Sequence, residues 1–311
     1  MPVEELHKIA PSPIYTLEEP AFNKSNNKSS QPLSHPHDKP PISRWILSLL
    51  YKLQKYSAYT FLSFLGIHLT SVVIVPIFPI SKDIKEEVFS LAKAVYQGIP
   101  FYEPFVIFGS GIVHVLSGIA LRFCRSKNNN KTQNKTMHQI KKNLSNNKIV
   151  IKETDDDIGF GGISNLVGLG YRRSFTSQLF GLTPLQFSGY LSLPFVLSHI
   201  FKFRYIPYAI EGDSSLVNLS YISYALKLKH TLLNCFLLTG LVWVMSYHTT
   251  NGVMKLKGLY SKNWKRIGLS VVNCLGICGC ISIYLFKREE IAGEADFIGR
   301  TFTKYINSFL L

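Results

Sequence analysis

The sequence predicts an all-α integral membrane protein with about five transmembrane helices. Of its 311 residues, 46% are apolar and only 17% are charged, whereas soluble domains carry about 25% charged residues. Uncharged apolar runs of about 20 residues recur along the chain, and each is long enough to cross a hydrocarbon core. The net charge of +15 comes mainly from basic residues in the polar segments between these runs, as the positive-inside rule describes. We therefore expect contacts with membrane phospholipids and none with nucleic acid.

The apolar runs divide the chain into two helical hairpins and one additional helix. Residues 43–123 form the first hairpin, and residues 183–290 form the second hairpin with the fifth span. The expected spans are 57–78, 103–123, 184–203, 230–254 and 267–286. An amphipathic lead-in at 43–56 is expected to lie at the membrane interface. A low-complexity loop, 124–182, joins the hairpins, and residues 291–311 form a C-terminal tail.

The segment 1–42 differs from the rest of the chain in being polar and rich in proline. Such a composition cannot bury an apolar core, so we expect this segment to be disordered. Three polar segments are basic: the flank on the N-terminal side of the first span, the 124–182 loop and the 255–266 loop. With five spans these three segments share one side of the membrane, which predicts a cytosolic N-terminus.

The first and third spans resemble one another closely enough to indicate an internal repeat. SAYTFLSFLGIHLTSVVIVP covers residues 57–76, and SGYLSLPFVLSHIFKFRYIP covers residues 188–207. Both open with Ser-x-Tyr, both place a histidine at the same offset (His68 and His199), and both close with proline at the same distance beyond it. Two related helical hairpins are the simplest explanation, since internal repeats are common in membrane proteins.

The second and fourth spans correspond as well. HVLSG (114–118) and HTTNG (248–252) share the pattern His-x-x-x-Gly, and a basic residue follows each within a few positions. Each of the four repeated spans therefore carries one histidine at a repeated position: His68, His114, His199 and His248. Because a histidine in a bilayer is costly, these side chains are expected to face the interior of the bundle.

Two interpretations of the four histidines remain open. Two neutral imidazoles from different helices form a suitable axial pair for haem b, and His114 with His248 is the favoured pair. His68 with His199 is the competing pair. The HTTNG sequence is also similar to the haem-side helix of the membrane anchor subunits of succinate dehydrogenase. The alternative is that these histidines only form hydrogen bonds between helices.

The sequence contains little that suggests an enzyme or a metal centre. The five cysteines are odd in number and include no Cys-x-x-Cys pair, so neither a disulfide framework nor a zinc site is indicated. No nucleophile–base arrangement or pair of carboxylates is recognisable, and we expect no catalytic residues. A solute transporter is also disfavoured, because the central spans contain no acidic pair and, histidines aside, only Glu103 and Lys202 carry charge near membrane depth.

The sequence RRSFTSQLFGLTPLQFSGYLSLPFVLSHIFKFRYIP (172–207), together with YHTTNG (247–252), resembles a fungal family of the mitochondrial outer membrane, the Mdm-ten-complementing proteins. The resemblance covers roughly residues 43–290. It implies a multi-pass protein of the mitochondrial outer membrane that takes part in lipid homeostasis.

The resemblance also implies a binding partner. Members of the family bind the bridge-like lipid-transfer protein vacuolar protein sorting thirteen through an N-terminal Pro-x-Pro motif, which reads apolar-x-x-apolar-x-Pro-x-Pro. In LHKIAPSP this motif is filled by Leu6, Ile9, Pro11 and Pro13. An extended segment of this kind can place two apolar anchors and two prolines in a groove at low entropic cost, since proline is already restricted.

These observations favour a membrane receptor that recruits a lipid-transfer protein to organelle contact sites. Delivery of lipid to one leaflet creates an imbalance, so the bundle is also a candidate for phospholipid scrambling along a polar groove. The residues expected to line such a groove are Thr70, Ser110, Ser117, Ser198 and Lys202. A b-type cytochrome related to the succinate dehydrogenase anchors is the alternative function.

Overall fold

The computed structural model describes residues 44–124, 175–293 and 295–308. Within these ranges every regular element is a helix. Four of the helices are long and apolar enough to cross a membrane. They are Trp45–Ile77, Tyr102–Cys124, Thr231–Lys257 and Lys262–Arg288. The predicted class, an all-α membrane protein, is therefore confirmed.

The predicted third span, 184–203, is helical but is not among these four helices. It forms α6 (Pro184–Ile200) and the start of the π-helical η6 (Phe201–Tyr205). With 17 residues, α6 is shorter than these four helices, and it carries four polar side chains of serine and histidine along its length (Ser188, Ser192, Ser198 and His199). Nevertheless, α6 packs along α9 (Thr231–Lys257). The polar side chains of α6 are thus placed beside another helix of the bundle.

The first long helix, α1 (Arg44–Leu69), begins well before the predicted first span. The amphipathic lead-in is continuous with that span and is not a separate interfacial element. Its large apolar side chains remain exposed on the protein, as Trp45 at 69% and Tyr56 at 63% show. An aromatic ring near the end of a transmembrane helix is suited to the headgroup layer.

The internal repeat is visible in the backbone. After α1, a π-helical stretch, η1 (Thr70–Ile74), begins two residues beyond His68. After α6, η6 likewise begins two residues beyond His199. Each stretch leads into a turn of helix with proline in its first turn, namely η2 (Val75–Ile77) and α7 (Ile206–Glu211). The two histidines therefore lie next to unusual backbone in both repeats. Such π-helical stretches are frequent at functional sites.

Between the first two spans, the chain forms α2 (Lys82–Lys93) and the π-helical η3 (Ala94–Gly98). Ser81 caps α2 by accepting a hydrogen bond from the Ile84 amide. The second span then begins as η4 (Tyr102–Gly109) and continues as an α-helix over 110–124. The connection between the first two spans is therefore helical.

The two last spans form a hairpin, α9 followed by α10 (Lys262–Arg288). Glycines of α10 allow the two helices to approach closely. A Cβ added to Gly276 would lie 2.5 Å from the Trp243 ring, and one added to Gly279 would lie 2.6 Å from Val242. Small residues at such contacts are typical of membrane helix pairs, where close packing supplies much of the association energy.

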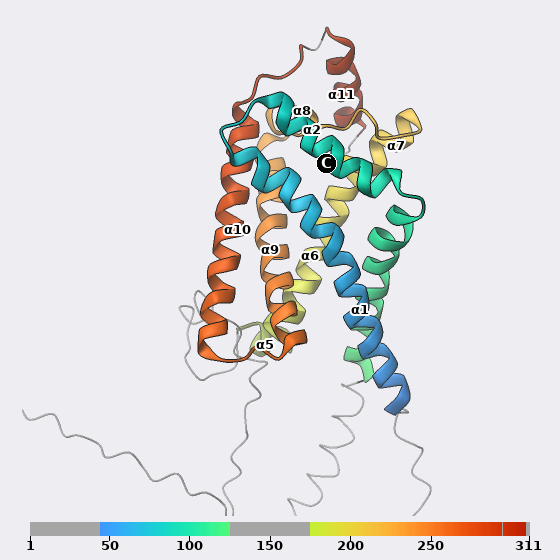
Figure 1. Cartoon of the computed structure of the whole chain (residues 1–311), viewed down its shortest axis with the longest axis vertical. Coiled ribbons are helices and arrows are strands. Elements are labelled where there is room, and N and C mark those ends of the chain that lie inside the picture. Colours follow the sequence, from blue (N-terminus) through green and yellow to red (C-terminus); the bar gives the residue numbers. More distant parts are fainter. Residues whose placement is uncertain (1–43, 125–174, 294, 309–311) are drawn as a thin grey trace, which may run out of the picture. The chain divides into compact units, whose positions relative to one another are not determined.

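Short helices gather at one end of the long helices (Figure 1). There α8 (Leu219–Lys227) and α11 (Phe297–Asn307) bury an aromatic cluster. The cluster includes Tyr221, Tyr224, Phe302 and Tyr305, each at most 1% exposed. The expected C-terminal tail, 291–311, thus contains a helix that packs against the rest of the protein. Apolar side chains recur at helical spacing in α11, and this stripe buries against α8.

Candidate intramembrane polar site

The four histidines of the repeat meet as two pairs. The rings of His114 and His248, from the 110–124 helix and α9, have centroids 6.1 Å apart with planes at 80°. The rings of His68 and His199, from α1 and α6, have centroids 5.9 Å apart with planes at 70°. The structure therefore brings together the same pairs that the sequence suggested. Whether either pair holds a haem stays a prediction.

Hydrogen bonds orient the rings of the His114–His248 pair. The Nδ1 atom of His114 lies 3.2 Å from the Gln54 carbonyl oxygen. A carbonyl oxygen can only accept, so this nitrogen carries the proton. The Nδ1 atom of His248 lies 3.2 Å from the Ser188 hydroxyl, which donates to the Leu185 carbonyl and so can accept from the imidazole. In both rings this leaves Nε2 as the unprotonated nitrogen.

The His68–His199 pair has a different environment. Both Nδ1 atoms are buried and have no hydrogen-bond partner among the described residues. Aromatic rings enclose the pair instead. Phe64 stacks on His68 at 5.3 Å, and Phe203 lies 5.0 Å from His199. Leaving a buried polar group without a partner costs about 1–3 kcal/mol, so the two nitrogens call for an explanation.

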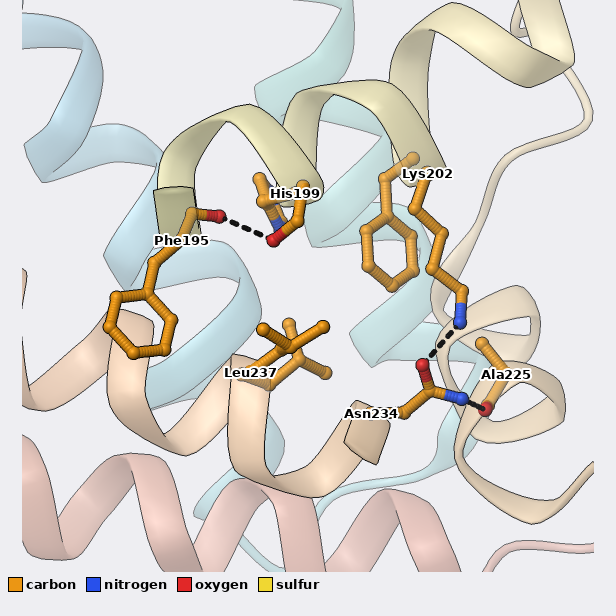
Figure 2. A pocket seen from close by; sticks show the side chains of 9 residues that line it. Phe195, His199, Lys202, Ala225, Asn234 and Leu237 are labelled. Atoms are coloured by element: carbon orange, nitrogen blue, oxygen red, sulfur yellow. Dashed lines mark hydrogen bonds between the residues drawn. The ribbon is translucent and has the colours of Figure 1, made fainter. Parts of the chain in front are cut away.

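A buried lysine lies in a pocket beside this second pair (Figure 2). Lys202 is 5% exposed, and its ammonium group donates to the Asn234 side-chain oxygen at 2.6 Å. Asn234 in turn donates to the Ala225 carbonyl at 2.7 Å. The pocket is partly open, and its empty space of about 330 Å³ includes space outside the protein. It is lined by Phe195, Ser198, His199, Lys202, Phe203, Ala225, Asn234, Leu237 and Leu238.

The pocket lies near one end of the membrane-spanning helices. Asn234 is the fourth residue of α9, so it lies about 5 Å along the axis from the start of that helix. Lys202 follows the last residue of α6 by two positions. A cation at this depth is close to the level at which lipid headgroups meet the hydrocarbon core.

Ionic contacts join the spans next to the pocket. Arg204 donates to both carboxylate oxygens of Glu103, at 2.5 and 2.7 Å, and also to Ser214. On α2, the ammonium group of Lys93 donates to the carbonyls of Ser214, Ser215 and Val217, at 2.5, 2.9 and 3.0 Å. Burial, and then the charge of Arg204, lowers the pKa of Lys93. These contacts fix the 212–218 loop over this end of the bundle.

The sequence matches a known protein family. The family described as MDM10-complementing protein 1, transmembrane domain, matches residues 63–177 and 194–287. The chain belongs to this family. No curated protein and no solved structure matches it. All four paired histidines, as well as Lys202 and Asn234, lie within the matched residues of the MDM10-complementing domain.

Most of the residues expected to line one polar groove do not share a site in this MDM10-complementing chain. Thr70 and Ser117 donate to the Gly66 and His114 carbonyls of their own helices. Ser110 and Ser198 do the same toward Val106 and Phe195. Such bonds satisfy a hydroxyl in an apolar surrounding without any contact across helices. Of the five predicted residues, only Ser198 and Lys202 line the pocket.

Other polar side chains of this region were not identified from the sequence. Asn234 has no motif around it, and its role depends on the packing of α9 against α6. Likewise, Lys93 gave no signal, because its three acceptors are backbone carbonyls more than 100 residues away. The proposed partner-binding residues, Leu6, Ile9, Pro11 and Pro13, lie outside the described residues.

Proposed function

We propose that this protein is a receptor of the mitochondrial outer membrane that recruits a bridge-like lipid-transfer protein, vacuolar protein sorting thirteen. The recruiting element is the N-terminal segment with Leu6, Ile9, Pro11 and Pro13. Membership of the MDM10-complementing protein 1 family supports this proposal, as does the presence of every fixed position of the family's Pro-x-Pro motif. The helical bundle anchors this segment at the membrane, with the N-terminus in the cytosol.

Binding of the full-length protein in liposomes to the adaptor-binding region of the lipid-transfer protein tests the receptor role. We expect micromolar binding that the double variant Pro11→Ala, Pro13→Ala abolishes, because both prolines lose their fixed backbone geometry. The matched control is Ser12→Ala, which changes the free position between the two prolines. Absence of binding by the unaltered protein contradicts the proposal, and so does full binding by the double variant.

We further propose that the bundle equilibrates phospholipids between the two leaflets. The observation that carries this proposal is the pocket in which Lys202, Asn234 and Ser198 lie together beside the apolar rings of Phe195 and Phe203. A phospholipid presents an anionic phosphate beside apolar chains, and an ammonium group is a common partner for phosphate. A receptor with this property relieves the imbalance that a lipid-transfer bridge creates.

The scrambling role is tested with purified protein in vesicles that carry a fluorescent phospholipid. Dithionite bleaches only the outer leaflet, so an active protein makes more than half of the label accessible. We expect Lys202→Met to slow this transfer several-fold, because the pocket loses its cation while it keeps a side chain of similar length. Lys287→Met, at an exposed lysine of α10, is the control. Equal rates for protein-containing and empty vesicles exclude scrambling.

A further inference from the structure

We propose that His114 and His248 are the two axial ligands of a haem b bound inside the helical bundle. This site is separate from the Lys202 pocket and does not depend on lipid transfer. Four observations support it: the distance between the two rings, the hydrogen bonds that orient them, the contrast with the second histidine pair, and the surroundings along the two helices.

The distance between the rings suits two ligands of one metal ion. A histidine nitrogen lies about 2 Å from a metal ion that it binds, as it does from zinc, and the ring centroid lies roughly 1 Å behind that nitrogen. Two imidazoles on opposite sides of one ion therefore have centroids about 6 Å apart. The His114 and His248 centroids are 6.1 Å apart. The planes at 80° leave both rings free to stand perpendicular to a flat macrocycle.

Distance alone does not identify the pair, because contacting aromatic rings also have centroids about 4.5–7 Å apart. The hydrogen bonds are more informative. Metal-binding histidines usually donate their second ring N–H to a carbonyl or another acceptor, which fixes the tautomer and the ring orientation. His114 donates in this way to the Gln54 carbonyl, and His248 donates to the Ser188 hydroxyl. Two neutral Nε2 atoms are thereby available as ligands.

The other pair lacks these supports. The Nδ1 atoms of His68 and His199 find no acceptor among the described residues, and the rings pack against Phe64 and Phe203. Without a fixed tautomer, neither ring is prepared to present a particular nitrogen to a metal ion. This contrast assigns the ligand role to His114 and His248.

The surroundings of the favoured pair also suit an iron porphyrin. Gly252 lies one turn beyond His248, and a Cβ added there would meet nothing within 4 Å. A flat ring can therefore approach the backbone of α9 at this level. Arg122 lies eight residues beyond His114, and Lys255 lies seven residues beyond His248. Both are about 10–12 Å along the helix axis from the ligand on their own helix, where a cation can meet the carboxylates of a haem.

The test is the optical spectrum of the full-length protein, purified in detergent from cells supplied with a haem precursor. We expect the spectrum of a low-spin haem with two histidine ligands, a sharp α band after reduction with dithionite, and equimolar haem and protein. Apoprotein titrated with hemin should give the same spectrum and a higher melting temperature, because a ligand that binds only the folded state stabilises it. Absence of haem bands in both preparations overturns the proposal.

Variants then identify the ligands. His114→Ala and His248→Ala should each lose the low-spin spectrum, whereas His68→Ala and His199→Ala should retain it. Size-exclusion chromatography and circular dichroism identify variants that fail to fold. Added imidazole should restore the low-spin spectrum of His248→Gly by occupying the vacated axial position, and a purely structural histidine would not show this effect. Loss of the spectrum only in the His68 and His199 variants overturns the assignment.

Discussion

Arg204 holds both carboxylate oxygens of Glu103, at 2.5 and 2.7 Å, and so joins two spans that are 101 residues apart in the sequence. The two side chains are 28% and 19% exposed, so solvent screens them less than it screens a surface pair. Breaking a fully buried pair costs about 3–5 kcal/mol, and an exposed pair contributes about 0–1 kcal/mol. We therefore expect the contribution of the Glu103–Arg204 pair to stability to lie between these limits.

The first prediction concerns this ion pair. Glu103→Gln should lower the free energy of unfolding by about 1–3 kcal/mol, because Arg204 loses its charged partner while it remains half-buried. Thermal or denaturant unfolding in detergent micelles measures the change. Glu211→Gln is the control, since Glu211 contacts Lys304 at 3.4 Å and the two side chains are 35% and 59% exposed. An equal loss in both variants would contradict the assigned role.

The second prediction concerns the lysine that holds the 212–218 loop. Lys93→Met removes a charged donor from three backbone carbonyls, and we expect a loss of about 1–3 kcal/mol in unfolding free energy. Protease accessibility of the loop should rise in the same variant. Lys82→Met, at an exposed position of the same helix, should change stability by less than about 0.5 kcal/mol. A loop that stays equally protected in both variants would show that Lys93 does not hold it.

The third prediction concerns the contact of α9 with α10. Gly279→Ala places a methyl group 2.6 Å from Val242, and we expect this overpacking to cost about 1–3 kcal/mol. Gly66→Ala in α1 is the matched control, because its added Cβ meets nothing within 4 Å. The control should be as stable as the unaltered protein or slightly more so, since alanine favours a helix over glycine. Melting temperatures of the two variants decide the point, and equal values count against the close contact.

The fourth prediction concerns pH. Burial, with the nearby carboxylates of Glu211 and Asp213, raises the pKa of Tyr305 to about 12. In the unfolded chain the phenol loses its proton near its ordinary pKa of about 10, while in the folded protein it keeps the proton. Between these two values the folded state binds more protons, so stability falls as pH rises.

Unfolding measured across this pH range checks the sign. One such tyrosine contributes up to about 1.4 kcal/mol per pH unit, and Tyr305→Phe should remove that share of the slope. Near neutral pH the stability of the variant should depend on pH as that of the unaltered protein does, because the phenol is protonated in both the folded and the unfolded state. Identical slopes above pH 10 for the two proteins would contradict the argument.

Much of the candidate site could be predicted from the sequence because the repeat fixes positions along the helices. A histidine at the same offset in two related spans lies at the same depth, and an ionisable side chain in a bilayer is expected to face the interior. These two arguments suffice to pair His114 with His248 and His68 with His199. The sequence favoured His114 with His248, but the contacts that orient the rings of this pair come from Gln54 and Ser188 on other helices, and only the structure shows them.

The sequence by itself determined the class of the protein. Uncharged apolar runs of about 20 residues are long enough to cross a membrane, and a helix satisfies all of their backbone hydrogen bonds there. It also determined the repeat and the order of the spans. The tertiary structure decided which side chains form hydrogen bonds with each buried polar group and which faces pack together. Asn234 meets Lys202, and α11 buries its aromatic face against α8, only because helices distant in sequence pack together. Local pattern records the face that a helix buries, but the partner on that face is set by packing of the whole bundle.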